Sequence, residues 1–187
     1  MKTLNIAHAS QRMAMVTLFL IGAMLLLNTL SWFLPILASV EGGYGLSFSL
    51  TDRLISGFDV NILAFPWWQK IGGVVLSSIP LLILANGLYQ LYLLFQNFSQ
   101  GQYFSVTSAN YLGKVGRSVM LWVVLDFLCE PLLSMWMTIN AASGDHLITL
   151  SITASSLVAL FLAGCITIIA HILRQASIIE HENKQFI

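Results

Sequence analysis

The chain has 187 residues, of which 57% are hydrophobic and only 9% are charged, and its formal net charge is zero. A water-soluble domain carries roughly 25% charged residues, so this composition excludes an ordinary soluble globule. The balanced charge also gives no sign of a nucleic-acid surface. We therefore expect a membrane protein that does not bind nucleic acid directly.

The first apolar run covers residues 13–34 and follows two basic residues, Lys2 and Arg12. A cleaved signal peptide has an apolar core of about 7–15 residues, and this run is longer and lacks a convincing small-x-small cleavage site. A membrane-spanning helix needs about 20 apolar residues to cross the hydrocarbon core. The run is therefore predicted to be a retained first span.

A long connection, residues 35–70, separates the first two spans and ends in an aromatic cluster that includes Trp67 and Trp68. Indole rings suit the headgroup layer, because the ring is half buried there while its N–H still reaches a polar partner. We expect this connection to be an outer loop that lies partly on the outer leaflet.

Three further apolar runs are predicted to span the membrane, at 71–95, 118–139 and 147–173. Pro80 lies inside the second span and predicts a kink, because proline removes one backbone hydrogen bond. The polar tail, 174–187, is expected to continue the last helix into water. The fold predicted is a single all-α transmembrane domain, a bundle of four helices.

The basic residues predict the orientation of this bundle. Placing both termini in the cytoplasm leaves only Arg53 and Lys70 outside. The other six basic residues are then inside: Lys2, Arg12, Lys114, Arg117, Arg174 and Lys184. This bias agrees with the positive-inside rule, and Trp32, Trp67, Trp68 and Trp136 would then gather at the outer interface. We expect a multi-pass protein of the cytoplasmic (inner) membrane.

Two acidic residues, Asp126 and Glu130, lie within the third span. They are four residues apart and therefore share one helix face, about 12 and 18 Å from the cytoplasmic end of the span. A charged side chain at the bilayer centre costs at least ~2.5–3.5 kcal/mol, so both are expected to face the bundle interior. Either they join helices through hydrogen bonds or they bind a proton, a cation or a cationic ligand.

Polar residues on other spans offer partners for this pair. The fourth span carries a stripe at helical spacing: Thr149, Thr153, Ser156, Gly164, Thr167, His171 and Arg174. Asn28 and Asn86, on the first two spans, could also turn inward. The candidate ligand- or ion-binding residues are Asp126, Glu130, Asn86, Ser156 and Thr167.

No catalytic or metal-binding pattern is present. Cys129 and Cys165 lie in apolar runs, which indicates packing residues rather than a disulfide or a zinc site. The sequence has no HExxH motif, no phosphate-binding glycine loop and no GxSxG motif. We predict no catalytic residue, metal or cofactor, and hence a protein that is not an enzyme.

The connection between the second and third spans contains Gly101, Tyr103 and Phe104, followed by Asn110 and Gly116. With the tail Ile178-Ile179-Glu180-His181-Glu182-Asn183, it resembles a bacterial membrane family known as domain of unknown function 2975. Four spans in the same order extend the resemblance over nearly the whole chain. His181 stands where the family usually has an acid.

This resemblance brings no catalytic residue. It implies a genomic association with small helix-turn-helix regulators, and hence a cytoplasmic partner of that kind. Ser105 is predicted to cap a short interfacial helix at 106–113, before the third span. The residues expected to dock the partner are Tyr103, Phe104, Asn110, Ile179, Glu182 and Asn183.

The sequence thus favours a non-enzymatic regulatory membrane protein that contacts the lipid bilayer and docks a soluble cytoplasmic partner. The alternative is a small transporter, or a proton- or ion-coupled protein, that uses Asp126 and Glu130. Self-association into a homo-oligomer stays open.

Overall fold

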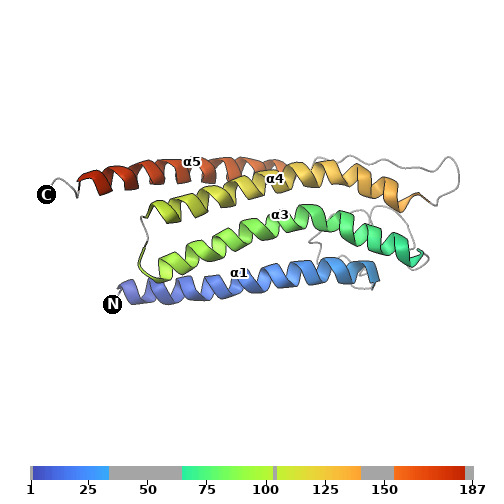
Figure 1. Ribbon diagram of the computed structural model, residues 1–187, viewed down its shortest axis with the longest axis horizontal. Coiled ribbons are helices and arrows are strands. Elements are labelled where there is room, and N and C mark those ends of the chain that lie inside the picture. The colour runs from blue at the N-terminus through green and yellow to red at the C-terminus, as the bar shows by residue number, and fades with distance from the viewer. Residues whose placement is uncertain (1, 34–64, 103–104, 140–153, 184–187) are drawn as a thin grey trace. The chain divides into compact units, whose positions relative to one another are not determined.

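The computed structural model describes residues 2–33, 65–102, 105–139 and 154–183. Within these ranges the chain forms four long helices (Figure 1). They are α1 (Lys2–Phe33), α3 (Trp67–Ser99), α4 (Val106–Met137) and α5 (Ala154–Asn183). Each is long and apolar enough to cross a membrane, which identifies a multi-pass membrane protein. The predicted all-helical architecture is confirmed for these ranges.

The helices are longer than the apolar runs that predict them. α3 begins at Trp67, inside the expected outer loop, because the Pro66 carbonyl accepts hydrogen bonds from the amides of Gln69 and Lys70, at 3.0 and 3.3 Å. Pro80 lies within this helix and is fully buried. The rest of the expected outer loop, up to residue 64, is outside the described residues.

The connection between α3 and α4 is a Schellman turn. Gly101 adopts a φ of 82°, which only glycine tolerates readily. The Gln102 amide then donates to the Asn97 carbonyl and the Gly101 amide to the Phe98 carbonyl, both at 3.1 Å. Gly101 therefore ends α3.

Ser105 caps the start of α4, as predicted, since its hydroxyl accepts a hydrogen bond from the Ser108 amide at 3.1 Å. The separate interfacial helix expected at 106–113 is not observed. These residues are the first turns of α4, which continues to Met137. No proline lies between Val106 and Ser118 to stop the helix, and the glycines there face α5 rather than breaking the helix.

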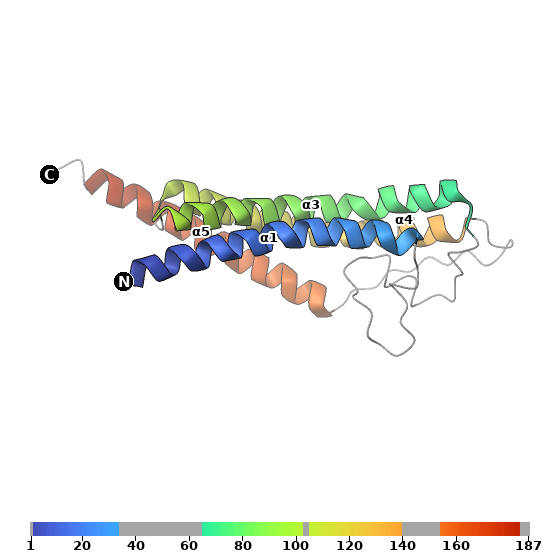
Figure 2. The ribbon, with the colours of Figure 1, turned by 90° about the horizontal axis from the view of Figure 1, so that it is seen from below.

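The four helices contribute to two compact units. The first unit contains residues 1–21, 83–121 and 154–187, and the second contains residues 22–82 and 122–153. In the first unit, the start of α1, the α3–α4 connection and the end of α5 lie at the same end (Figures 1 and 2).

The second unit has an aromatic and sulfur-rich core formed by Trp32, Cys129, Leu133 and Met137. Trp32 was expected at the membrane interface, but its side chain is completely buried. Its ring lies against Gly73, where a Cβ atom would overlap it, and its indole N–H donates to Ser77 Oγ at 3.3 Å. The missing side chain of Gly73 makes room for the indole, which explains the burial.

Gln69 of α3 and Trp136 of α4 form another contact between helices in this unit. The fully buried Gln69 amide donates to the Trp136 and Met137 carbonyls at 3.0 and 3.2 Å. The Trp136 indole N–H donates in return to the Gln69 carbonyl at 3.0 Å. Carbonyls at a helix C-terminus lack intrahelical partners, so Gln69 satisfies the end of α4.

Candidate functional site

The acidic pair lies in the second unit, on the buried face of α4. Asp126 is 8% exposed and Glu130 is 4% exposed. The same face continues through the buried residues Leu133, Ser134 and Met137, at spacings of three and four. Both carboxyl groups interact with other groups of the protein. The expected burial of the pair is confirmed.

Further polar groups are buried in this unit. Asn28 is 3% exposed, and its amide nitrogen donates to Ser78 Oγ at 3.2 Å. Within the described part of the chain, Asn28 Oδ1 accepts no hydrogen bond. Ser77 and Ser78 each donate to the Val74 carbonyl, at 3.2 and 2.6 Å. The interior of this unit therefore contains two carboxyl groups. It also contains the Asn28 side-chain oxygen, which can still accept a hydrogen bond.

The three other predicted ligand residues belong to the first unit. Asn86 is exposed, with Leu82 and Tyr89 beside it on an exposed face of α3, so of the two asparagines that could turn inward only Asn28 does so. Thr167 is partly buried and donates to the Ala163 carbonyl at 2.8 Å. Ser156 is also partly buried. These residues and the acidic pair are thus divided between the two units.

The predicted docking residues are only partly described. Asn110 is exposed on α4, and Ile179 is 58% exposed on α5. Glu182 and Asn183 belong to the last turn of α5, with side chains outside the described set. Tyr103 and Phe104 also lie outside the described residues.

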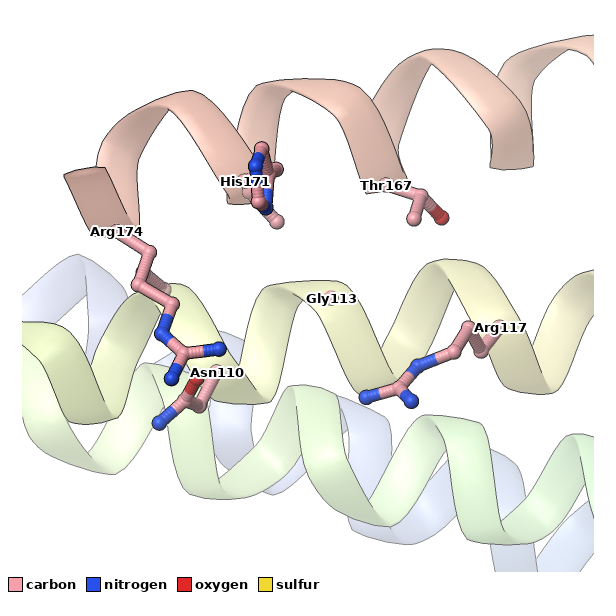
Figure 3. A pocket seen from close by; sticks show the side chains of 8 residues that line it. Asn110, Gly113, Arg117, Thr167, His171 and Arg174 are labelled. Atoms are coloured by element: carbon pink, nitrogen blue, oxygen red, sulfur yellow. The ribbon is translucent and has the colours of Figure 1, made fainter.

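A cavity of about 300 Å³ opens between α4 and α5 in the first unit (Figure 3). Its eight lining residues are small or polar: Ala109, Asn110, Gly113, Arg117, Thr167, Ala170, His171 and Arg174. Figure 3 shows Arg174 reaching from α5 towards Asn110 on α4, while Arg117 lies further along α4 on the other side of Gly113. None of these eight residues is acidic.

Small residues bring α4 and α5 together beside this cavity. A Cβ atom at Gly116 would overlap Thr167 Oγ1 and would lie 2.9 Å from the Ala163 carbonyl oxygen. One at Gly113 would lie 3.5 Å from the Ala170 Cβ. Small residues of this kind allow transmembrane helices to approach closely. The two helices that form the cavity walls therefore pack closely beside it.

Part of the lining of this cavity could be predicted from the sequence. The predicted stripe on the fourth span includes Thr167, His171 and Arg174, all of which line it. In the sequence analysis, Arg117 was used only to predict the topology. However, Asn110, Gly113 and Arg117 are spaced three and four residues apart, so they share a face of α4. That spacing is the signal that could have identified the α4 wall.

The described residues contain no group of three or more histidines, cysteines, aspartates or glutamates positioned to hold a metal ion. The titratable groups at the cavity are two arginines and His171, and the His171 ring contacts the Gln175 amide at 3.3 Å. This arrangement supplies hydrogen-bond donors and positive charge.

No curated protein and no solved structure matches the chain. A family model described as "Protein of unknown function (DUF2975)" matches residues 3–187, which is almost the full length. The resemblance found in the α3–α4 connection and the tail is thereby confirmed. Because the match covers nearly the whole chain, this chain belongs to the DUF2975 family.

Proposed function

We propose that this protein is a non-enzymatic regulatory protein of the cytoplasmic membrane, with both termini inside, which docks a soluble cytoplasmic protein. Six of the eight basic residues fall on the side assigned to the cytoplasm.

The observation that carries the proposal is the extension of α5 beyond its apolar run. The run ends at Leu173, and the helix continues through Arg174 and Gln175 to Asn183. Ten further residues extend it by about 15 Å. Ile178 and Ile179 on this extension are 40% and 58% exposed. Exposed apolar side chains on a helix outside the bilayer suit a groove in a partner protein.

The sequence around these isoleucines indicates the chemistry of the partner. In the sequence, the acidic residues Glu180 and Glu182 follow directly after the isoleucines. Small DNA-binding regulators are basic and helical, which complements this combination. The proposed partner is therefore a small helix-turn-helix regulator.

The test compares two pairs of isoleucines on the same helix. The variant Ile178→Ala with Ile179→Ala should lose the regulator when the tagged protein is purified from native membranes in mild detergent. The control is Ile168→Ala with Ile169→Ala, which changes residues that are 63% and 51% exposed within the apolar run. It should retain the regulator, because those side chains face lipid.

Deleting residues 177–187 should act like the first variant, since the deletion removes the docking isoleucines and leaves every apolar run, including 147–173, intact. Mass spectrometry identifies what is co-purified. Recovery of a helix-turn-helix protein with equal yield from both isoleucine variants would refute the proposal, as would its absence from the unaltered protein.

A second candidate function is proton or cation coupling through the acidic pair. The specific observation in its favour is the burial of both carboxyl groups, together with the Asn28 oxygen that accepts no hydrogen bond among the described residues. Buried ionisable groups within spans often mark ion pathways.

A further inference from the structure

The cavity between α4 and α5 gathers positive charge without a neutralising carboxylate. Arg117 and Arg174 line it from opposite helices, together with His171 and Asn110. Among the residues that the structure describes, neither arginine forms an ion pair with a carboxylate. Both side chains are exposed, so their guanidinium groups are available to a ligand.

We propose that this cavity binds a phosphate-bearing anion. A guanidinium group matches phosphate geometry because it donates two parallel N–H···O bonds. Asn110 and His171 add further donors from the two walls. A volume of about 300 Å³ is at the lower end of the range for ligand sites and fits a small anionic group rather than an extended molecule.

The position of the cavity along the helices indicates where this anion could come from. Arg117 immediately precedes the apolar run of α4, and Arg174 immediately follows that of α5. Both arginines are therefore at the polar border of their spans, at the depth of lipid headgroups. Basic pockets between spans at this depth bind anionic headgroups. The same donors would also hold a soluble phosphate compound from the aqueous side.

The packing of the two helices supports a built site. Ala109, Gly113 and Ala170 line the cavity with small side chains, and the nearby contact of Gly116 with Thr167 holds the walls at a short separation. The Thr167 hydroxyl already donates to the Ala163 carbonyl, so the arginines, His171 and Asn110 provide the donors.

The decisive variant is Arg117→Gln with Arg174→Gln in the full chain. Its matched control is Arg12→Gln with Lys114→Gln, which removes the same charge from exposed residues of the same unit that do not line the cavity. Circular dichroism verifies that both variants remain helical. Should the glutamine variant fail to fold, Arg117→Lys with Arg174→Lys keeps the charge and removes bidentate binding, and a smaller loss of affinity is expected.

Two binding measurements distinguish the sources. In the first, native mass spectrometry follows titration with cardiolipin or phosphatidylglycerol, with phosphatidylcholine as the reference lipid. In the second, calorimetry follows titration with inorganic phosphate and pyrophosphate in detergent without anionic lipid. The decisive variant should bind about tenfold more weakly for each arginine removed, whereas the control should match the unaltered protein.

If the decisive variant loses affinity only in the lipid titration, the cavity is a headgroup site. If it loses affinity only in the phosphate titration, the ligand is a soluble anion. Equal affinities of the decisive variant and the control in both titrations would overturn the proposal. The result is independent of partner docking, because the deletion of residues 177–187 leaves all eight lining residues in place.

Discussion

At the scale of single residues, the cost of placing charge in hydrocarbon predicted the burial of the acidic pair, whereas the position of a neutral amide was not predictable in this way. Asp126 and Glu130 are buried, as the desolvation cost of a carboxylate requires. Of the two amides that could turn inward, Asn28 is buried and Asn86 is exposed. A neutral amide is cheaper to leave in contact with lipid, so its side chain follows the helix face selected by its neighbours.

The residue-scale prediction concerns the acidic pair. Asp126→Asn with Glu130→Gln should remain folded and keep partner docking, because amides retain hydrogen bonding without charge. Asp126→Leu with Glu130→Leu should lower the free energy of unfolding by about 1–3 kcal/mol per side chain, since the buried groups that interact with them lose a polar counterpart. Unfolding in mixed micelles, followed by circular dichroism, measures both. Asn86→Leu, at an exposed residue, is the control with little expected change.

The ion-coupled alternative predicts that the folded amide variant loses transport activity. If the native chain conducts protons or cations into proteoliposomes loaded with a pH-sensitive dye, a folded amide variant should abolish that flux. Such a loss would favour the acidic pair as a functional site over a packing role.

At the scale of elements, glycine determines where helices touch. Gly116 lies where α4 meets Thr167 and Ala163 of α5, whereas Gly22 on α1 has no atom within 4 Å of an added Cβ. Both glycines are inside helices, so their intrinsic cost to helix formation is the same. Their surroundings therefore decide the effect of adding a methyl group.

We accordingly expect alanine to have opposite effects at the two positions. Gly22→Ala should raise the free energy of unfolding by up to about 1 kcal/mol through helix propensity. Gly116→Ala should lower it by about 1–3 kcal/mol, because the methyl group would force α4 and α5 apart. Denaturation in mixed micelles measures both variants. A stabilising effect of Gly116→Ala would show that the close approach is absent.

At the scale of the whole molecule, the proposed orientation with both termini in the cytoplasm follows from the positive-inside rule and can be tested directly. The structure also guides the choice of positions for testing this. Ser10 and Ser108 are buried, so a cysteine there would be shielded whichever way the chain is oriented. Gln11 and Gln102 are exposed and therefore report the aqueous side directly.

In a chain without Cys129 and Cys165, a cysteine at Gln11 or Gln102 should resist an impermeant maleimide in intact cells. Both should label after permeabilisation, because they are expected to face the cytoplasm. A cysteine at Ser49, between the first two spans, should label in intact cells. Labelling of Gln11 and Gln102 but not Ser49 before permeabilisation would reverse the assigned orientation.

The sequence by itself determined the class of the protein and the number of spans. Each span requires about 20 consecutive apolar residues, and this local requirement is read directly from the chain. It also determined the cap at Ser105, because a hydroxyl that accepts from the next turn's amides is a local interaction. The ends of the helices were less predictable, since backbone hydrogen bonding continues beyond the apolar run, as from Leu173 to Asn183 in α5.

In α1 and α3, which carry no acidic residue within their apolar runs, only the tertiary structure decided which face is buried. A helix that is apolar all round carries no stripe to mark its packing face, and in lipid no hydrophobic force drives one face inward. Trp32 is buried because Gly73 on another helix leaves space for its ring. The cavity likewise depends on two helices, since Arg117 and Arg174 are 57 residues apart in sequence and line one cavity only because Gly113 and Gly116 allow α5 to approach α4.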